Sequence, residues 1–186
     1  FELITISLIF SVFFVFLISF DNINRPDGGL YHLPYISALN ENKIIIGLAN
    51  LHFRFGHTSI LQYFEAGFNN IIFKEIGILI PKSILFFSIC LYFLKEFQLN
   101  LKSKKVFFSI LSFLIFFQIF YDMNRYSYQC NDVPAHLIIL FVSYFFLRND
   151  ISKYNNFFLI SIICLFAFQI KSTSIVMLLL PLAIII

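Results

Sequence analysis

Apolar stretches that approach the thickness of a membrane constrain this chain more than any other feature. A bilayer core of about 30 Å is crossed by roughly 17–25 apolar helical residues, and lipid offers backbone groups no partner outside their own helix. Four stretches approach that length with at most one formal charge each: residues 1–20, 76–94, 106–121 and 133–147. We therefore expect an all-α fold, a polytopic transmembrane helical bundle.

The last apolar stretch, residues 157–186, contains a single charge, Lys171, at the start of a short polar run. At 1.5 Å per residue a helix over this stretch extends about 45 Å. That length is too long for one upright span and short for two. One tilted helix and two broken helices both agree with it.

The composition agrees with a membrane protein and excludes several other classes. Of the 186 residues 60% are hydrophobic, 28 are Phe and only 12% are charged, whereas soluble globular chains are about 45–50% apolar and about 25% charged. A cytosolic enzyme, a nucleic-acid binder and a disordered tail are excluded, and no basic patch suggests nucleic acid as a partner. The scattered Cys90, Cys130 and Cys164 indicate neither a disulfide framework nor a metal knuckle.

The two ends of the sequence also carry information. The chain begins at Phe1 and stops at Ile186 inside an apolar run. We expect residues 1–186 to be a single membrane domain from the N-terminal part of a longer chain. Segment 1–20 lacks the basic leader and the small-residue cleavage site of a signal peptide, so we interpret it as a retained span.

Lysine and arginine are unevenly distributed among the connecting segments, which predicts the sidedness of the chain. The connectors 95–105 and 148–156 hold six of these residues in twenty positions, whereas segments 21–75 and 122–132 hold five in sixty-six. Short cytoplasmic loops of membrane proteins are rich in lysine and arginine. We therefore place 21–75, as a long first outer loop, on the outer face of the plasma membrane together with 122–132 and Lys171.

The outer loop 21–75 is the least generic part of the chain. Asp27 follows a proline and precedes two glycines, a pattern typical of a turn just outside a membrane helix. Residues 31–41 are predicted to form a short interfacial helix whose aromatic face, with Tyr31 and Tyr35, rests on the bilayer surface. Asp27 is either a turn residue that accepts local backbone bonds or a functional carboxylate at the membrane rim.

Three histidines and one arginine of this loop are candidate ligand-binding residues: His32, His52, His57 and Arg54. The structural alternative for His52 and His57 is packing at the membrane interface with one ring nitrogen satisfied. Arg54 is either a rim charge whose stem lies along apolar surface or a clamp for phosphate. The histidine spacing matches no short metal motif such as His-Glu-x-x-His, so we predict no metal site.

An aspartate just after the first apolar helix and a tyrosine four residues later, here Asp27 and Tyr31, resemble the outer-loop signature of GT-C glycosyltransferases. These polytopic enzymes, which include the protein O-mannosyltransferases and the lipid A aminoarabinose transferases, take sugar from a polyprenyl-phosphate carrier. A second stretch is similar to the family: an Asp-x-Pro beginning at Asp132 opens an apolar helix, a basic turn follows at Arg148, and the next helix closes on Lys171.

Two departures indicate an outlying branch of that superfamily. Gly28 replaces the acidic residue that usually follows the first aspartate, and the run 50–57 stands where a His-Pro-Pro pattern would be expected. Lys82, a charge inside an apolar stretch, has no counterpart in the family. The resemblance leaves the sugar open, and it leaves open a divalent cation as a cofactor.

The resemblance implies an inverting reaction in which an acceptor hydroxyl attacks the anomeric carbon and the carrier phosphate leaves. The resemblance assigns the hydroxyl proton to Asp27, and proton transfer of this kind contributes about 10²–10⁴ in rate. Lys171 and Arg54 would bind the phosphate, with Tyr31 and the three histidines in the substrate site. Asp132 either favours the positive end of its own helix or orients the acceptor or a bound cation.

Other functions stay open beside a glycosyltransferase. A multi-spanning transporter or flippase for a lipid-linked or polar substrate also gathers charges near broken helices, although the long outer loop favours the enzyme. An inactive GT-C-fold subunit agrees with the missing acid at position 28. The expected partners are a polyprenyl-phosphate-linked sugar donor and the lipid bilayer. The enzyme hypothesis requires Asp27, Asp132 and Lys171 to meet at one membrane surface.

Overall fold

The fold is helical throughout the part of the chain that the structure describes. The structure is a computed structural model, and it describes residue 9 and residues 27–42, 45–56, 58–121, 130–149 and 154–185. Within these ranges every regular element is a helix and no strand occurs, which confirms the predicted all-α fold. Segment 1–20 lies outside the described residues apart from Ile9, so its role as a retained span stays a prediction.

Short helices lie within residues 28–79, which we call the outer segment after the predicted outer loop, and longer helices follow it. The outer segment consists of the π-helix η1 (Gly28–His32), α2 (Leu33–Glu41), α3 (Leu48–Leu51), η2 (Phe53–Gly56), α4 (Ile60–Phe68) and η3 (Lys74–Leu79). The rest consists of α5 (Ile80–Lys102), α6 (Val106–Tyr121), α7 (Asp132–Arg148), α8 (Tyr154–Ile170), η5 (Ser172–Leu178) and α9 (Leu179–Ile185). The apolar stretches predicted to be helical from position 76 to position 147 are therefore helices.

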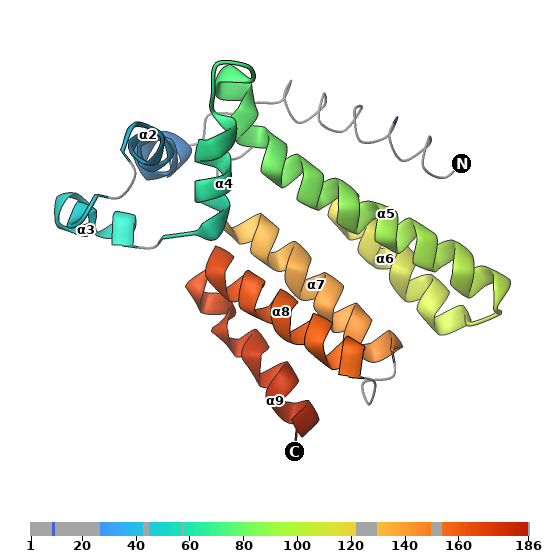
Figure 1. Ribbon diagram of the computed structural model, residues 1–186. Coiled ribbons are helices and arrows are strands. Elements are labelled where there is room, and N and C mark those ends of the chain that lie inside the picture. Colours follow the sequence, from blue (N-terminus) through green and yellow to red (C-terminus); the bar gives the residue numbers. More distant parts are fainter. Residues whose placement is uncertain are drawn as a thin grey trace.

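The last apolar stretch is a broken pair of helices, so the alternative of one tilted helix is wrong. Helix α8 ends at Ile170, Lys171 has an extended backbone (φ −145°, ψ 121°), and η5 begins at Ser172. The chain reverses at this point, and α9 runs back along α8 (Figure 1). The break places Lys171 at the turn between two antiparallel helices and not inside one continuous helix.

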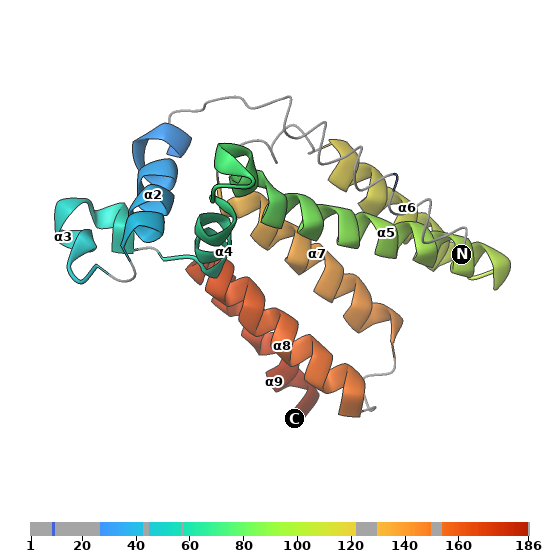
Figure 2. The ribbon, with the colours of Figure 1, turned by 45° about the horizontal axis from the view of Figure 1, so that its top comes forward.

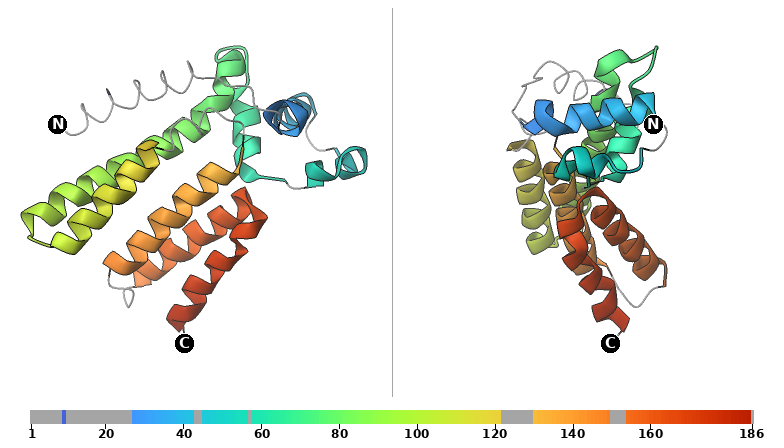
Figure 3. Two further views of the ribbon diagram at one scale, coloured as in Figure 1. Left: turned by 180° about the vertical axis from the view of Figure 1, so that it is seen from behind. Right: turned by 90° about the vertical axis from the view of Figure 1, so that its left-hand side faces the viewer.

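The long helices run up and down between two distinct ends. Helices α5 and α7 and the segment η5–α9 begin where α2, α3 and α4 lie, and α6 and α8 return to that end (Figures 1 and 2). We call this the capped end and the opposite one the far end. The cations at the tight α5–α6 connector and at the end of α7 lie at the far end (Figure 3). This separation is the one that the predicted topology requires, while the orientation in a membrane stays a prediction.

A buried aromatic and aliphatic core holds the long helices together. Phe86, Phe93, Tyr144 and Cys164 are completely or almost completely buried, and the rings of Phe93 and Tyr144 meet edge to face at 5.1 Å between centroids. These buried side chains gain van der Waals contacts across the helix interfaces. All three cysteines are buried free thiols.

Two local predictions for the outer segment are wrong. Asp27 is not on a turn, because its backbone is helical (φ −64°, ψ −34°) and the two glycines after it form η1, which continues directly into α2. The predicted helix over 31–41 exists, but Tyr35 is buried and stacks on Phe55 at 5.7 Å. The aromatic face turns inward because α2 packs on α4 through Ile36.

The apolar helices differ in whether they could cross a membrane alone. In the described part of the chain, one helical segment, Lys74–Lys102, is both long and apolar enough to do so. Three other apolar segments are shorter: Val106–Tyr121, Tyr154–Ile170 and Ser172–Ile184. The multi-pass topology therefore stays a prediction.

Candidate functional site

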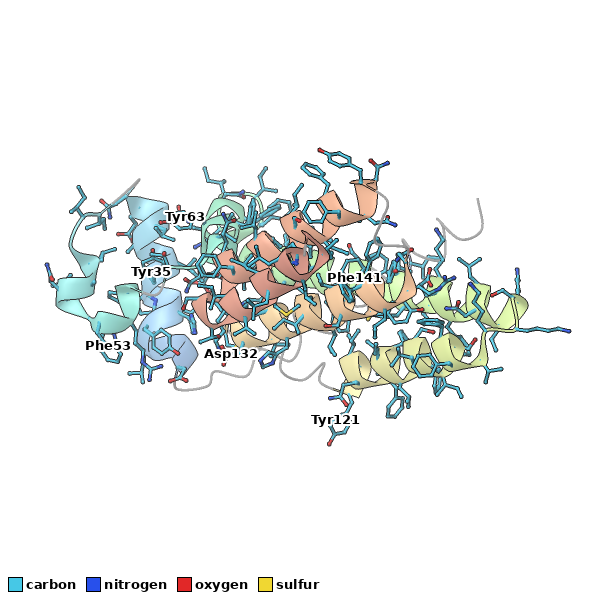
Figure 4. All side chains as sticks on the ribbon, turned by 90° about the horizontal axis from the view of Figure 1, so that it is seen from below. Tyr35, Phe53, Tyr63, Tyr121, Asp132 and Phe141 are labelled. Atoms are coloured by element: carbon cyan, nitrogen blue, oxygen red, sulfur yellow. The ribbon has the colours of Figure 1, made fainter. Side chains whose placement is uncertain are left out.

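A cavity of about 820 Å³ lies at the capped end, between the outer helices and the ends of α7 and α8. Figure 4 shows Tyr35, Tyr63 and Asp132, three of its lining residues, at the junction of these elements. Typical small-molecule sites measure about 300–1,000 Å³. The cavity is therefore large enough for a ligand of the size of a phosphosugar.

The cavity brings together most of the residues that the sequence predicted as a site. The lining includes Asp27, Tyr31, His32, Arg54, Asp132 and Lys171. They come from η1 and the residue before it, from η2, from the first turn of α7 and from the break after α8. Of the other two candidates, His52 is not among the lining residues and His57 lies outside the described residues.

One ion pair in the wall joins the two C-terminal contributions. The ammonium of Lys171 donates a hydrogen bond to Oδ1 of Asp132. Asp132 lies in the first turn of α7, where a carboxylate also favours the positive helix end. The helix-end role and a role in the cavity are thus compatible for this residue.

A second, looser pair lies across the outer segment. Nη1 of Arg54 is 4.0 Å from Oδ1 of Asp27, and about half of the Asp27 side chain is exposed. The guanidinium also lies 4.6 Å from the centre of the Tyr31 ring, a cation–π distance. Desolvation by burial raises the pKa of Tyr31, so its phenol is neutral at physiological pH. The Asp27 carboxylate therefore lies close to Arg54 and stays partly exposed to solvent.

His32 is a neutral, oriented imidazole in the same wall. It is 8% exposed, and burial, with a contribution from the charge of Lys82, lowers its pKa to about 4. Its Nδ1 lies 3.0 Å from Nε2 of Gln62. Because an amide nitrogen only donates, Nδ1 accepts this bond and the ring proton is on Nε2.

His52 has a structural position behind the cavity. Its ring stacks on Tyr31 at 6.3 Å and lies 5.2 Å from the ring of Phe53. Its Nδ1 accepts a hydrogen bond from the backbone N–H of Arg54 at 3.3 Å. This is the packing role with one satisfied ring nitrogen, and it fixes the start of η2, which carries Arg54.

The structure contains a buried ion pair, between Lys82 and Glu65, that was not predicted from the sequence. Nζ of Lys82 on α5 is 2.9 Å from Oε1 of Glu65 on α4, with side chains that are 2% and 1% exposed. Burial raises the pKa of Glu65, although Lys82 opposes the shift. One feature could have indicated this pair: the buried face of α4 carries Gln62 and Glu65 beside Leu61 and Ala66. Buried polar side chains are unfavourable unless they have hydrogen-bond or ionic partners.

The carboxylates of the cavity do not fit a divalent cation. In the ranges that the structure describes, no three histidine, cysteine or acidic side chains gather within reach of one ion. Asp27 faces Arg54, and Asp132 faces Lys171. A metal ion would have to displace these cations, so we derive no step through one.

The cavity has further lining residues that were not predicted as site residues. They are aromatic rings and amides, among them Tyr35, Phe55, Tyr63, Phe168, Gln62 and Asn131. One residue in five of the whole chain is aromatic, so an aromatic in the sequence does not distinguish this cavity from the core.

Comparisons with known proteins give one match. No curated protein and no solved structure matches the chain. A family match extends over residues 2–186, nearly the whole sequence. The chain belongs to this family, which is described as "Domain of unknown function (DUF8201)".

Proposed function

We propose that this protein is an integral-membrane glycosyltransferase of the GT-C type, which moves a sugar from a polyprenyl-phosphate carrier to an acceptor hydroxyl at the outer membrane face. The observation that carries the proposal is one cavity lined by Asp27, Arg54, Asp132 and Lys171. The reaction needs a carboxylate to accept a proton and cations to stabilise charge on the departing phosphate. This cavity holds both.

The surface of the long helices supports a polytopic membrane protein. Large apolar side chains are exposed along α5, α6, α8 and α9, for example Ile84, Phe107, Phe117, Phe158 and Leu182. Monomeric soluble proteins rarely expose apolar patches of more than a few hundred Å². Lipid tails would cover these side chains and would leave the capped end, with its cavity, among the headgroups of the outer leaflet.

In the proposed step the acceptor oxygen forms a bond to the anomeric carbon while the bond from that carbon to the phosphate oxygen breaks. The electron pair leaves with the carrier phosphate, and the acceptor proton passes to Asp27 and then to water. Asp27 suits this role because its carboxylate is half-exposed and only loosely paired with Arg54. Inversion at the anomeric carbon follows from a single displacement.

Lys171 would exchange partners during this step. In the structure it binds Asp132, and a carrier phosphate in the cavity would compete for the same ammonium group. Once Lys171 turns to the phosphate, the Asp132 carboxylate becomes available to an acceptor hydroxyl. The two predicted roles, phosphate binding by Lys171 and acceptor orientation by Asp132, are then linked.

A flippase for a lipid-linked substrate is the second candidate. The break of the helix pair at a charged residue, Lys171, favours it, because transporters place substrate sites at discontinuous helices. A third hypothesis, an inactive GT-C-fold subunit, would require no chemistry at this cavity.

One reconstitution experiment separates these functions. The full-length protein is inserted into vesicles that contain polyprenyl phosphate linked to a labelled sugar, with a mixture of hydroxyl acceptors outside. Transfer of the label or hydrolysis of the donor supports the enzyme. Movement of the intact donor between leaflets without chemistry supports the flippase, and the absence of both refutes both and leaves the inactive subunit.

A further inference from the structure

Two amide side chains in the cavity wall have carbonyl oxygens without a partner among the described residues. Gln62 on α4 is 3% exposed, and its Oε1 makes no hydrogen bond to any described residue. Asn131, which precedes the first turn of α7, has a buried Oδ1 in the same condition. Both residues line the cavity. These oxygens therefore point to a ligand that donates hydrogen bonds.

The bond to His32 orients the Gln62 amide. The amide nitrogen is engaged with Nδ1 of His32 at 3.0 Å, and in this orientation the amide oxygen has no donor among the described residues. A buried polar atom without a partner costs free energy. Oxygen acceptors fixed in this way fit hydroxyl groups, whereas a hydrocarbon chain or an ionised phosphate offers no donor.

The rest of the wall is suited to the faces of a sugar ring. Tyr63, about half of which is exposed, and Phe168 line the same cavity. Tyr35 and Phe55 also line it, but Tyr35 is buried and the two rings stack on each other at 5.7 Å, so the faces they share are not free for a ligand. A pyranose has hydroxyl groups around its edge and C–H groups on its faces, and the C–H faces pack well on aromatic rings. The cavity therefore combines acceptors for the edge with aromatic surface for a face.

We propose that Gln62 and Asn131 form the subsite that recognises the sugar of the carrier-linked donor. Their carbonyl oxygens accept hydrogen bonds from its hydroxyl groups, and His32 is a positioning residue that fixes the Gln62 amide. The assignment to the donor sugar rests on the proposed function, because it takes Arg54 and Lys171 as the binding groups for the adjoining phosphate.

The test is a comparison of binding affinities in the purified full-length protein. The probes are bare polyprenyl phosphate, polyprenyl phosphate carrying glucose, galactose or mannose, and an alkyl glycoside of each sugar. The wild type should bind at least one glycosylated carrier more tightly than the bare carrier. Gln62→Met and Asn131→Leu, which keep the side-chain volume, should each reduce that preference about tenfold, as expected for one lost hydrogen bond.

Two further variants control for indirect effects. Asn131→Asp retains an acceptor oxygen and should retain the preference, because its added charge weakens both carriers alike. Asn100 at the far end also has a buried Oδ1 without a partner among the described residues, so Asn100→Leu should leave the preference unchanged. Thermal unfolding of each variant shows whether it folds.

The outcomes distinguish this inference from the proposed function. Equal affinity of the wild type for bare and glycosylated carriers, or an undiminished preference in both Gln62→Met and Asn131→Leu, overturns the inference even if the protein transfers sugar. A preference that both variants lose supports it even if no transfer occurs. If only the alkyl glycosides depend on these amides, the subsite belongs to the acceptor and the donor assignment is overturned.

Discussion

Lys171 donates a hydrogen bond to the carboxylate of Asp132 across 39 residues of sequence. The contact joins the break after α8 to the first turn of α7, and it lies in the wall of the cavity. Neighbouring apolar helices offer few specific contacts that fix the position of one helix end against another. This ion pair supplies such a contact, and it leaves a cation where a ligand phosphate can reach it.

Removal of the Lys171 charge should weaken binding of bare polyprenyl phosphate. Hydrogen bonds to charged groups contribute about 1.5–3 kcal/mol, so Lys171→Gln should raise the Kd roughly 10–100-fold. Lys104→Gln at the far end is the matched control and should leave the Kd unchanged. An equal Kd for the wild type and Lys171→Gln would remove Lys171 from the phosphate site.

The two ends of the molecule should lie on opposite sides of the membrane. Ser37 on α2 and Ser103 at the α5–α6 connector are both exposed, and the native cysteines are buried, so single Ser→Cys variants give selective labels. A membrane-impermeant maleimide applied to intact cells should label Ser37→Cys and should label Ser103→Cys only after permeabilisation. The reverse pattern would place the cavity in the cytoplasm.

The long helices could be predicted from the sequence because each apolar stretch is bounded by charged residues at or near its ends. Asp132 and Arg148 bound α7, and Lys102 ends α5. The uneven distribution of basic residues also predicted that Asp27, Asp132 and Lys171 belong to one end, and all three line one cavity. Their chemical roles remain proposals.

The outer segment was harder to predict because its structure depends on tertiary contacts. Paired glycines after Asp27 are compatible with a turn or a helix. The helix forms because α2, into which it continues, packs on α4. The partner of Lys82 could not be predicted, because Glu65 belongs to a separate short helix. The orientation of the Gln62 amide depends on the bond from its nitrogen to His32, thirty residues away in the sequence.

The Glu65–Lys82 pair should show strong energetic coupling. Lys82→Met leaves a buried carboxylate without its cation and should lower the free energy of unfolding by about 3–5 kcal/mol. The double variant Glu65→Leu with Lys82→Met replaces both charges by apolar groups and should recover most of that loss. Chemical denaturation in detergent measures both values. Additive losses in the double variant would show that the two side chains do not depend on each other.

Acidification should destabilise the protein through His32. Burial lowers its pKa from 6.5 to about 4, so the unfolded chain takes up a proton at this residue in a range where the folded chain does not. Stability should therefore fall as the pH drops from 6.5 towards 4, with a contribution from His32 of up to about 3 kcal/mol. The Tm of His32→Gln should depend less on pH in this window than the Tm of the wild type. Parallel Tm curves would contradict a neutral, buried His32.

In the proposed sugar transfer at the capped end, Asp27 takes the proton of the acceptor hydroxyl. The most direct measurement is the single-turnover rate of transfer from a labelled polyprenyl-phosphate sugar by the reconstituted wild type and by Asp27→Asn. The rate should be about 10²–10⁴-fold lower in the variant, and the affinity for the bare carrier should change little. Transfer at the wild-type rate by Asp27→Asn would contradict this role of Asp27.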